Sequence, residues 1–245
     1  RGTSGLPATR VLDKAMLPIG NRPVVDYVIE QCAMAGIRRI VMVVNSAGSL
    51  ISQHYGKTVD IATEYPQLGI HGAIAMEYVV QPAGGYGTAS AVACVEAIVH
   101  DDRFVVIPAD AFIYNPTQPA LGKIIDAIHT SDVRGAVGGL VLDGGEVSKY
   151  SVITKENGHL TGLIEKPQGL DVNARYEANM SYYVLPQEIF DAIRSLTPTN
   201  NEYYLTDAVV AVAMKSPIAV VPVEGEYLDS GQLDSWVRAN VQLSQ

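Results

Sequence analysis

Apolar runs alternate along the chain with segments whose apolar residues recur at helical spacing. The apolar positions of residues 23–35 form one helical stripe, and this helix would begin near Pro23 and end before Gly36. Compact apolar runs at 39–45 and 74–80 predict buried strands. Strands that alternate with helices indicate an α/β fold, with a mixed, mainly parallel sheet flanked by helices.

The rest of the chain continues this pattern. Asn157-Gly158 separates two strand-like runs and is typical of a two-residue hairpin turn. Further strands are expected at 104–108, 136–142, 150–154, 160–165, 182–185 and 218–223. Further helices are expected at 87–99, 186–196, 206–214 (capped by Thr206 or a neighbour) and 233–243.

Size and composition limit the class of protein. The chain of 245 residues suits one domain over 1–245, and its 48% hydrophobic content excludes a disordered protein. A net charge of −9 argues against a broad basic face for nucleic acid, whereas a small phosphorylated ligand needs only a few cations. The apolar runs are too short for a membrane span, and two cysteines make no disulfide framework, so we expect a cytoplasmic protein.

A glycine-rich segment opens the sequence. Gly2 and Thr3 lie in the run Gly2-Thr3-Ser4-Gly5, and Lys14 follows. Backbone N–H groups of such a loop can approach phosphate oxygens closely, and a following lysine can place a charge on them. The alternative is an ordinary flexible terminus. Because a functional loop rarely opens a protein, we expect further residues before Arg1.

A second glycine-rich segment follows the strand expected at 74–80. Gln81 can offer both a donor and an acceptor to the edge of a base, and Gly85 and Gly87 permit close backbone approach. A turn between a strand and a helix is a common ligand site in α/β proteins. The alternative is a purely structural turn with Gly87 near the start of the helix.

Two aspartates follow strand-like runs far apart in the sequence. Asp110 comes after the run at 104–108, and Asp229 lies in Leu228-Asp229-Ser230-Gly231. Carboxylates at such positions can hold Mg²⁺, which prefers oxygen ligands and substrate phosphates. The alternative is that each aspartate caps a helix or a turn.

Glu165-Lys166-Pro167 ends the predicted hairpin. An adjacent acid and base would suit a ligand that carries both hydroxyls and a phosphate. The alternative is a solvated turn, because Lys and Glu are usually exposed.

Taken in order, these segments resemble the sugar-1-phosphate nucleotidyltransferases over nearly the whole chain. The glucose-1-phosphate uridylyltransferases and thymidylyltransferases are the most similar members. The matching segments are Leu6-Pro7-Ala8-Thr9 with Lys14 and Met16-Leu17-Pro18, Gly85-Tyr86-Gly87-Thr88-Ala89, Ala109-Asp110, Glu165-Lys166-Pro167, Asn179-Met180-Ser181-Tyr182-Tyr183, Leu205-Thr206-Asp207-Ala208 and Leu228-Asp229-Ser230-Gly231.

The resemblance implies a Rossmann-like fold whose first strand would precede Arg1. It also implies an Mg²⁺-dependent reaction in which a nucleoside triphosphate (UTP or dTTP) and a sugar 1-phosphate give a nucleotide sugar and pyrophosphate. It further implies a homo-oligomer, a dimer or tetramer. The net charge and the short apolar runs lead us to expect neither a nucleic-acid nor a membrane partner. The residues that it implicates are Asp110 and Asp229 for the metal, Lys14 for the triphosphate, Gly2, Thr3, Gln81, Gly85 and Gly87 for the nucleotide, and Ser151, Glu165, Lys166 and Asn179 for the sugar phosphate.

The sequence departs from the family pattern at three positions that matter for activity. Ser4 replaces the arginine of the opening loop, and Ser151 and Ser181 replace glycines of the sugar pocket. Loss of a charge-assisted contact at Ser4 would cost about 1.5–3 kcal/mol. Two hypotheses follow: an active enzyme with an altered donor or sugar, or a catalytically impaired relative that acts as a nucleotide-sugar sensor or regulatory subunit. A dehydrogenase would need the dinucleotide fingerprint, which is absent from the sequence.

Overall fold

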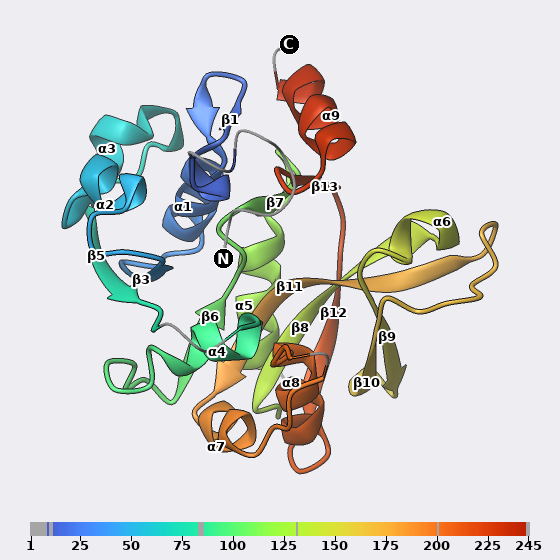
Figure 1. Ribbon diagram of the computed structural model, residues 1–245. Helices are drawn as coiled ribbons and strands as arrows, with labels where there is room; N and C mark the ends of the chain where they lie inside the picture. The colour runs from blue at the N-terminus through green and yellow to red at the C-terminus, as the bar shows by residue number, and fades with distance from the viewer. Residues whose placement is uncertain (1–8, 10–11, 83–85, 131, 200, 244–245) are drawn as a thin grey trace. The chain divides into compact units, whose positions relative to one another are not determined.

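The computed structural model describes residues 9, 12–82, 86–130, 132–199, 201–243. The chain divides into two compact units (Figure 1). Unit 1 comprises Arg1–Pro82, Pro108–Pro119 and Glu226–Gln245, and unit 2 comprises Ala83–Ile107 and Ala120–Gly225. The expectation of a single domain over 1–245 stays a prediction.

Unit 1 contains three small sheets. In the first, β3 (Arg39–Val44) pairs in parallel with β5 (Ala73–Val80), which also pairs antiparallel with β4 (Thr58–Asp60). The other two are antiparallel pairs, β1 (Pro18–Ile19) with β2 (Arg22–Pro23) and β7 (Ala111–Tyr114) with β13 (Glu226–Asp229). The helical segments are η2 (Lys14–Met16), α1 (Val24–Met34), α2 (Leu50–Tyr55), α3 (Ile61–Glu64), η3 (Pro66–Leu68) and α9 (Leu233–Leu243).

Helix α1 supplies much of the core of unit 1, as its apolar stripe predicted. Val25 and Ile29 are fully buried in a cluster that also takes in side chains of β3, β5 and α2. The helix begins after Pro23, and the left-handed φ of +79° at Gly36 lies just beyond its end. The predicted helix is therefore confirmed, and so are the strands expected at 39–45 and 74–80.

Helix α9 holds the β1–β2 hairpin by its side chains. The indole Nε1 of Trp236 donates to the carbonyl of Pro18 at 2.7 Å, and Asn240 Oδ1 accepts from the backbone N–H of Gly20 at 3.0 Å. Tyr27 of α1 donates its hydroxyl to the carbonyl of Ile19 at 2.8 Å. The hairpin that follows η2 is thus fixed from two helices.

Unit 2 is built on one six-stranded sheet, in the order β6-β11-β8-β12-β10-β9. Strands β8 and β12 pair in parallel, whereas the other described pairs in this sheet are antiparallel. The strands are β6 (Arg103–Val106), β8 (Gly135–Asp143), β9 (Ser151–Glu156), β10 (His159–Glu165), β11 (Arg175–Pro186) and β12 (Ile218–Val223). The helices are α4 (Thr88–Ala93), α5 (Ala120–Thr130), α6 (Gly144–Val147), α7 (Glu188–Arg194) and α8 (Leu205–Ala213).

Strand β11 accounts for much of the antiparallel pairing. The sequence predicted a strand only at 182–185, but β11 begins at Arg175 and pairs with β6, β8 and β9. Its register with β8 shifts between Asn179 and Tyr183, and Ser181 in this bulge has a φ of +59°. The mixed α/β class is confirmed, but the expectation of a mainly parallel sheet is wrong. Among the described strand pairs only β3–β5 and β8–β12 are parallel, because β11 and the β9–β10 hairpin add antiparallel pairs.

Several other predictions can be compared with the structure directly. Strand β12 and helix α9 have the predicted bounds, and the hairpin turns at Asn157 and Gly158, whose φ values of +49° and +80° suit a type I′ turn. The helix expected at 87–99 ends at Ala93. The cap was expected at Thr206 or a neighbour, but Thr206 lies inside α8. The helix begins after Tyr204, which makes no side-chain cap, and the Leu205 N–H donates to Thr88 Oγ1 at 3.1 Å.

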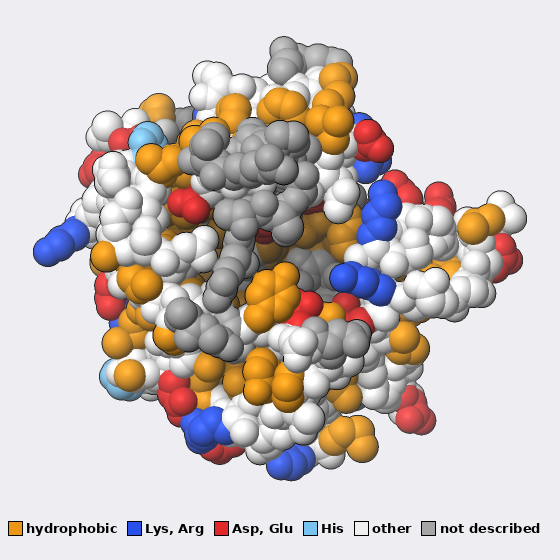
Figure 2. Space-filling model, in the orientation of Figure 1, with side chains coloured by type: hydrophobic (Ala, Val, Ile, Leu, Met, Phe, Trp, Pro, Cys, Tyr) orange, Lys and Arg blue, Asp and Glu red, His pale blue; other side chains and the backbone are white. Residues whose placement is uncertain are grey.

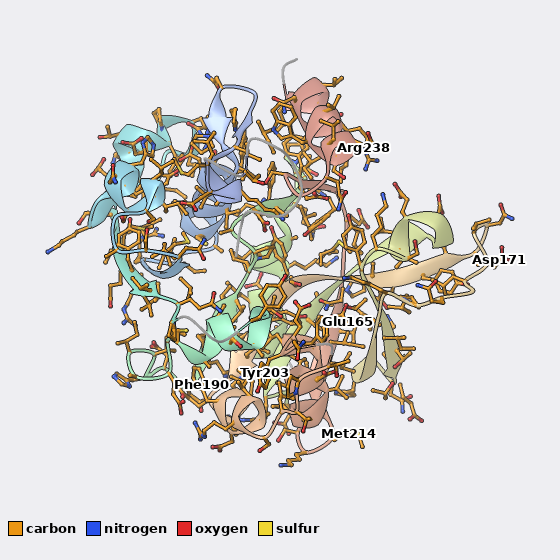
Figure 3. The ribbon with its side chains drawn as sticks, viewed as in Figure 1. Glu165, Asp171, Phe190, Tyr203, Met214 and Arg238 are labelled. Carbon is orange, nitrogen blue, oxygen red and sulfur yellow. The ribbon has the colours of Figure 1, made fainter. Side chains whose placement is uncertain are left out.

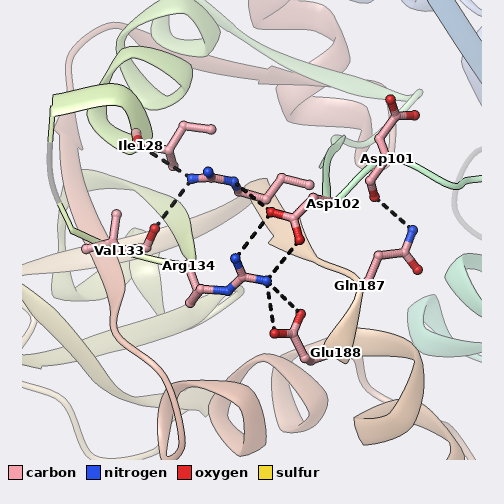
Figure 4. Close-up of polar contacts among 8 residues, drawn as sticks. Asp101, Asp102, Ile128, Val133, Arg134, Gln187 and Glu188 are labelled. Carbon is pink, nitrogen blue, oxygen red and sulfur yellow. Dashed lines mark hydrogen bonds and ion pairs between the residues drawn. The ribbon is translucent and has the colours of Figure 1, made fainter.

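An ionic network in unit 2 joins the residues that directly precede β6 and β8 to the first residue of α7 (Figure 4). The Arg134 guanidinium contacts Asp102 at 3.0 Å and Glu188 at 3.0 Å. Beside this network, Gln187 Nε2 donates a hydrogen bond to the backbone carbonyl of Asp101 at 2.8 Å. Because these groups are largely exposed, each pair stabilises the fold by about 1 kcal/mol at most, so the network defines geometry more than stability.

Charges of both signs are scattered over the face that Figure 2 shows, and the described lysines and arginines form no broad patch there. In the described ranges, no helix combines the length and the apolar character that a membrane span requires.

Candidate functional site

The pairing of β7 with β13 brings the two predicted metal aspartates together in unit 1. Asp229 is the last residue of β13 and is in register with Ala111, the first residue of β7. Asp110 directly precedes Ala111, and its carbonyl accepts the backbone N–H of Ser230 at 3.0 Å. Two residues far apart in the sequence thus lie at the same end of one two-stranded ladder.

Ser230 connects this pair to Lys14. Its side chain is fully buried, and its Oγ lies 3.1 Å from the carbonyl oxygen of Lys14 and 3.1 Å from that of Asp110. One hydroxyl hydrogen can serve either carbonyl or be shared between them. The residue therefore fixes the backbone of the predicted triphosphate lysine against the backbone of a predicted metal ligand.

The electrostatics of Asp110 fit a cation site. Burial raises the pKa of its carboxyl, the Lys14 ammonium opposes that rise, and the Asp229 carboxylate adds to it. Asp229 Oδ1 accepts the N–H of Gly231 at 2.8 Å and that of Gln232 at 3.2 Å, which fixes its orientation. Two carboxylates that repel each other would be relieved by a divalent cation.

The donor set suits one metal in particular. Within the described ranges, no group of three or more His, Cys, Asp or Glu side chains is placed to hold a metal. Zn²⁺ and Ca²⁺ sites usually draw on three or more protein ligands. Mg²⁺ is commonly held by one or two carboxylates together with waters and substrate phosphates, so Asp110 and Asp229 fit it.

The β9–β10 hairpin places Glu165 in unit 2. Ser151 stands opposite Glu165 in the ladder, and its hydroxyl donates to Glu165 Oε1 at 2.8 Å. The hydroxyl of Thr206, from the first turn of α8, donates to the same oxygen at 2.9 Å. Figure 3 shows Glu165 beside α8. Ser151 therefore contacts Glu165, the residue predicted to bind the sugar. The sequence did not indicate this contact.

Lys166 follows with an unusual backbone. Its N–H donates to the carbonyl of Tyr150 at 3.0 Å, and its φ is +41°. A left-handed conformation is uncommon for a lysine, and the following Pro167 restricts it further. Strain of this kind collects at functional sites, which agrees with the role predicted for this exposed lysine.

Asn179 lies in the bulge of β11, opposite Ser151 in the β9–β11 pair. Its Oδ1 accepts the N–H of Ser181 at 3.0 Å, and its Nδ2 donates to the Tyr183 hydroxyl at 2.6 Å. Burial raises the pKa of the Tyr183 hydroxyl, so this group stays protonated at neutral pH. The structure thus brings Ser151, Glu165 and Asn179 together.

Among the predicted nucleotide residues, Gln81 and Gly87 lie in different units. Gln81 follows β5, and its N–H donates to the carbonyl of Val44 at 2.9 Å, at the carboxyl end of the parallel pair. Gly87 has a φ of +107°, and a Cβ there would lie 2.3 Å from the Tyr203 carbonyl oxygen. The structural alternative for Gly87 thus has a direct physical basis. Gly2, Thr3 and Gly85 lie outside the described residues.

Two buried hydroxyl residues of these clusters were missed at the level of sequence. Ser230 lies in a segment that matches the family pattern, and Thr206 or a neighbour is predicted as a helix cap. The partners of both hydroxyls are more than forty positions away in the sequence. Neither residue lies within an apolar run, because each stands beside an aspartate, so the local pattern did not mark either hydroxyl as buried.

Comparison with known proteins bears on the whole chain. A family model described as "Nucleotidyl transferase" matches residues 1–245. A UTP–glucose-1-phosphate uridylyltransferase of Bacillus subtilis (strain 168) is 29% identical over 260 residues, which cover 99% of this chain and 86% of the relative. A UTP–glucose-1-phosphate uridylyltransferase of Mycoplasma pneumoniae is 25% identical over 258 residues, which cover 98% and 88%.

Solved structures agree with this assignment. A UDP-glucose pyrophosphorylase complexed with UDP-glucose has a TM-score of 0.83 and 26% identity, covering 98% of this chain and 94% of that chain. A putative glucose-1-phosphate thymidylyltransferase from Bacillus anthracis, with a TM-score of 0.78 and 20% identity over 98% and 89% of the two chains, shows a shared fold. The resemblance to the sugar-1-phosphate nucleotidyltransferases and the predicted fold class are both confirmed, and the chain belongs to the nucleotidyl transferase family.

Proposed function

We propose that this enzyme transfers a nucleotidyl group from a nucleoside triphosphate to a sugar 1-phosphate. A phosphate oxygen of the sugar phosphate would form a bond to the α-phosphorus while the bond from that phosphorus to the pyrophosphate oxygen breaks. The products are a nucleotide sugar and pyrophosphate. UTP and glucose 1-phosphate are the first substrates to test, because the names of the relatives specify them. The observation that carries the proposal is the convergence of Asp110, Asp229 and Lys14.

Unit 1 would supply charge neutralisation. Asp110 and Asp229 would hold Mg²⁺, which supplies positive charge to the phosphate oxygens when bound. Lys14 would place a further positive charge on the triphosphate, and Gln81 would contact the base. Phosphoryl transfer needs little covalent chemistry from the protein, so positioned charge is the main contribution expected of these residues.

Unit 2 would bind the sugar phosphate. Glu165 would accept a hydrogen bond from a sugar hydroxyl, and Lys166 would bind the phosphate. Asn179 and Ser151 would line the same pocket. Gly2, Thr3, Gly85 and Gly87 are proposed for the nucleotide on the resemblance alone. A homo-oligomer rests on the same basis, and sedimentation would test it. A cytoplasmic location is proposed from the short apolar runs and the two cysteines, and cell fractionation would test it.

The second hypothesis, a sensor or regulatory subunit, is supported only by Ser4, Ser151 and Ser181. Ser181 adopts the left-handed φ of +59° in place of a glycine, so this departure from the family pattern does not disrupt β11. Ser151 is accommodated by a hydrogen bond. Ser4 lies outside the described residues. The structural case for impairment is therefore weak at two of the three positions.

The first experiment is pyrophosphate release with Mg²⁺, for each nucleoside triphosphate against a panel of sugar 1-phosphates. Turnover with one pair is expected. Binding of a nucleotide sugar without turnover for any pair would instead favour the sensor.

The metal assignment is tested by Asp110→Asn, with Asp101→Asn as the matched control. Asp101 is exposed and belongs neither to the group of Asp110, Asp229 and Lys14 nor to the group around Glu165. We expect Asp110→Asn to lose at least 100-fold in turnover, since about 2.7 kcal/mol of barrier corresponds to two decades, while the control keeps wild-type activity. Near-normal turnover in Asp110→Asn, over an Mg²⁺ titration, would exclude this residue as a ligand.

A further inference from the structure

The two hydroxyls on Glu165 form an arrangement that the proposed function does not explain. Ser151 and Thr206 come from different elements, β9 and α8, and both are almost fully buried at 4% and 5% exposure. Both donate to the same oxygen, Oε1, at 2.8 and 2.9 Å. Among the described residues, no hydrogen bond ends on the other oxygen, Oε2, and no cation pairs with this carboxylate.

We propose that Ser151 and Thr206 are positioning residues that hold Glu165 in one orientation and so make the enzyme selective for sugar phosphates with a hydroxyl opposite Oε2. The inference rests on the proposed function, in which Glu165 binds the sugar. It adds that selectivity depends on two residues that do not themselves need to touch the sugar.

The chemistry of a carboxylate supports this assignment. An ionised carboxylate only accepts hydrogen bonds, and its two oxygens offer about four acceptor positions. With two donors on Oε1, the remaining acceptor capacity lies mainly on Oε2, and its natural complement is a hydroxyl donor. Hydroxyl partners orient the carboxylate without neutralising its charge, so Oε2 remains a strong acceptor for an uncharged hydroxyl of the sugar.

The surrounding elements make the arrangement rigid. Ser151 is held from both sides, because β9 pairs with β10 at Glu165 and with β11 at Asn179. Thr206 lies in the first turn of α8, which packs beside β10, so its hydroxyl is presented from a fixed backbone. A free glutamate side chain loses rotamer freedom when it binds a ligand, so a glutamate held in advance binds more tightly and more selectively.

A structural role and a positioning role predict different results. If the hydroxyls only stabilise the hairpin, their removal should lower stability and affect all substrates alike. If they position Glu165, their removal should impair the binding and turnover of only those sugar phosphates that carry the hydroxyl bound by Oε2. An analogue that lacks this hydroxyl should then be used equally well by the variants and by the wild type.

The experiment uses the full chain and the sugar 1-phosphate that the panel identifies, together with its monodeoxy analogues. The variants are Ser151→Ala and Thr206→Val, with Thr206→Ser as the conservative replacement that keeps the hydroxyl. Thr154→Val is the matched control, because Thr154 is on the same strand and its Oγ1 bonds only to Thr161 among the described residues.

We expect Ser151→Ala and Thr206→Val each to lower kcat/KM for the sugar phosphate by about tenfold, the loss typical of one hydrogen bond to a charged group. The KM for the nucleoside triphosphate should stay within about twofold, and one deoxy analogue should abolish the difference from wild type. Thr206→Ser and Thr154→Val should behave as wild type. Equal losses with every deoxy analogue, or failure of Thr206→Ser to restore activity, would overturn the proposal.

Calorimetric binding of UDP-glucose to the same variants separates this proposal from the proposed function. A wild-type enzyme that is active while its variants bind and turn over normally would refute only the positioning role. A wild-type protein with neither turnover nor binding would refute both.

Discussion

Replacement of Gly87 by alanine tests whether this glycine serves the fold or the nucleotide. The new Cβ would lie 2.3 Å from the carbonyl oxygen and 2.7 Å from the nitrogen of Tyr203. Both distances are much shorter than an ordinary contact of 3.4–4 Å. Tyr203 cannot move away cheaply, because its N–H donates to Tyr86 at 2.9 Å and its carbonyl accepts from Ala89 at 3.1 Å.

The expected loss follows from these contacts. A φ of +107° is unfavourable for alanine, and such backbone strain costs about 1–3 kcal/mol. Overpacking against a fixed backbone adds about 1–3 kcal/mol. We therefore expect Gly87→Ala to lower the free energy of unfolding by about 2–6 kcal/mol, which corresponds to roughly 4–24 °C in Tm for a chain of this size.

Urea and thermal unfolding measure this effect against two glycine controls. At Gly36 the φ is +79° and no heavy atom lies within 4 Å of a Cβ, so Gly36→Ala isolates the backbone contribution. Gly122 is in α5 with open space around it, and Gly122→Ala should stabilise the helix by up to about 1 kcal/mol. If Gly87→Ala unfolded like Gly36→Ala while the KM for the nucleotide rose, the steric argument would be wrong and the glycine would serve the ligand.

Three further substitutions or measurements test other parts of the structure. Ser230→Ala should cost about 1 kcal/mol in stability and raise the Mg²⁺ concentration for half-maximal activity, and an unchanged Mg²⁺ titration would contradict the coupling described for its hydroxyl. Lys166→Gly should relieve the left-handed φ and gain up to about 1 kcal/mol in stability while affinity for the sugar phosphate falls; a loss of stability would show that the backbone is not strained. Burial raises the pKa of Cys32 to about 12, so alkylation at pH 8, followed by mass spectrometry, should modify this thiol only in denaturant, and rapid modification in the folded protein would exclude the burial.

The sequence predicted best where one period dominates a segment. Strand β12 and helix α9 were located to the residue, because each has a continuous apolar or amphipathic pattern bounded by polar residues. The first half of β11 was missed, since its run from Arg175 to Ser181 has no clean alternation and contains the bulge. A strand-like run before Asp229 was recognised, but the bounds and the partner of β13 were not predicted, because four residues carry too little pattern.

The candidate site shows the same limit. Asp110 and Asp229 could be suspected as a pair, since both follow apolar strands, and their common ladder supports that suspicion. The hydrogen bonds of Glu165 could not be predicted. Thr206 is forty-one positions away in the sequence, and its hydroxyl comes within hydrogen-bond distance only because α8 packs beside β10. Long-range pairing depends on tertiary structure, which local propensity does not encode.

The discontinuous construction of unit 1 has a consequence for biosynthesis. A ribosome releases β7 long before β13, because all of residues 115–225 must be translated between them. Throughout that interval the nascent chain exposes the edge of β7 without its partner, and an unpaired apolar edge is prone to wrong association. Unit 2 lies within the residues made before Glu226 and can fold first. The pair of aspartates on which catalysis is proposed to depend would then come together only after unit 2 has been translated.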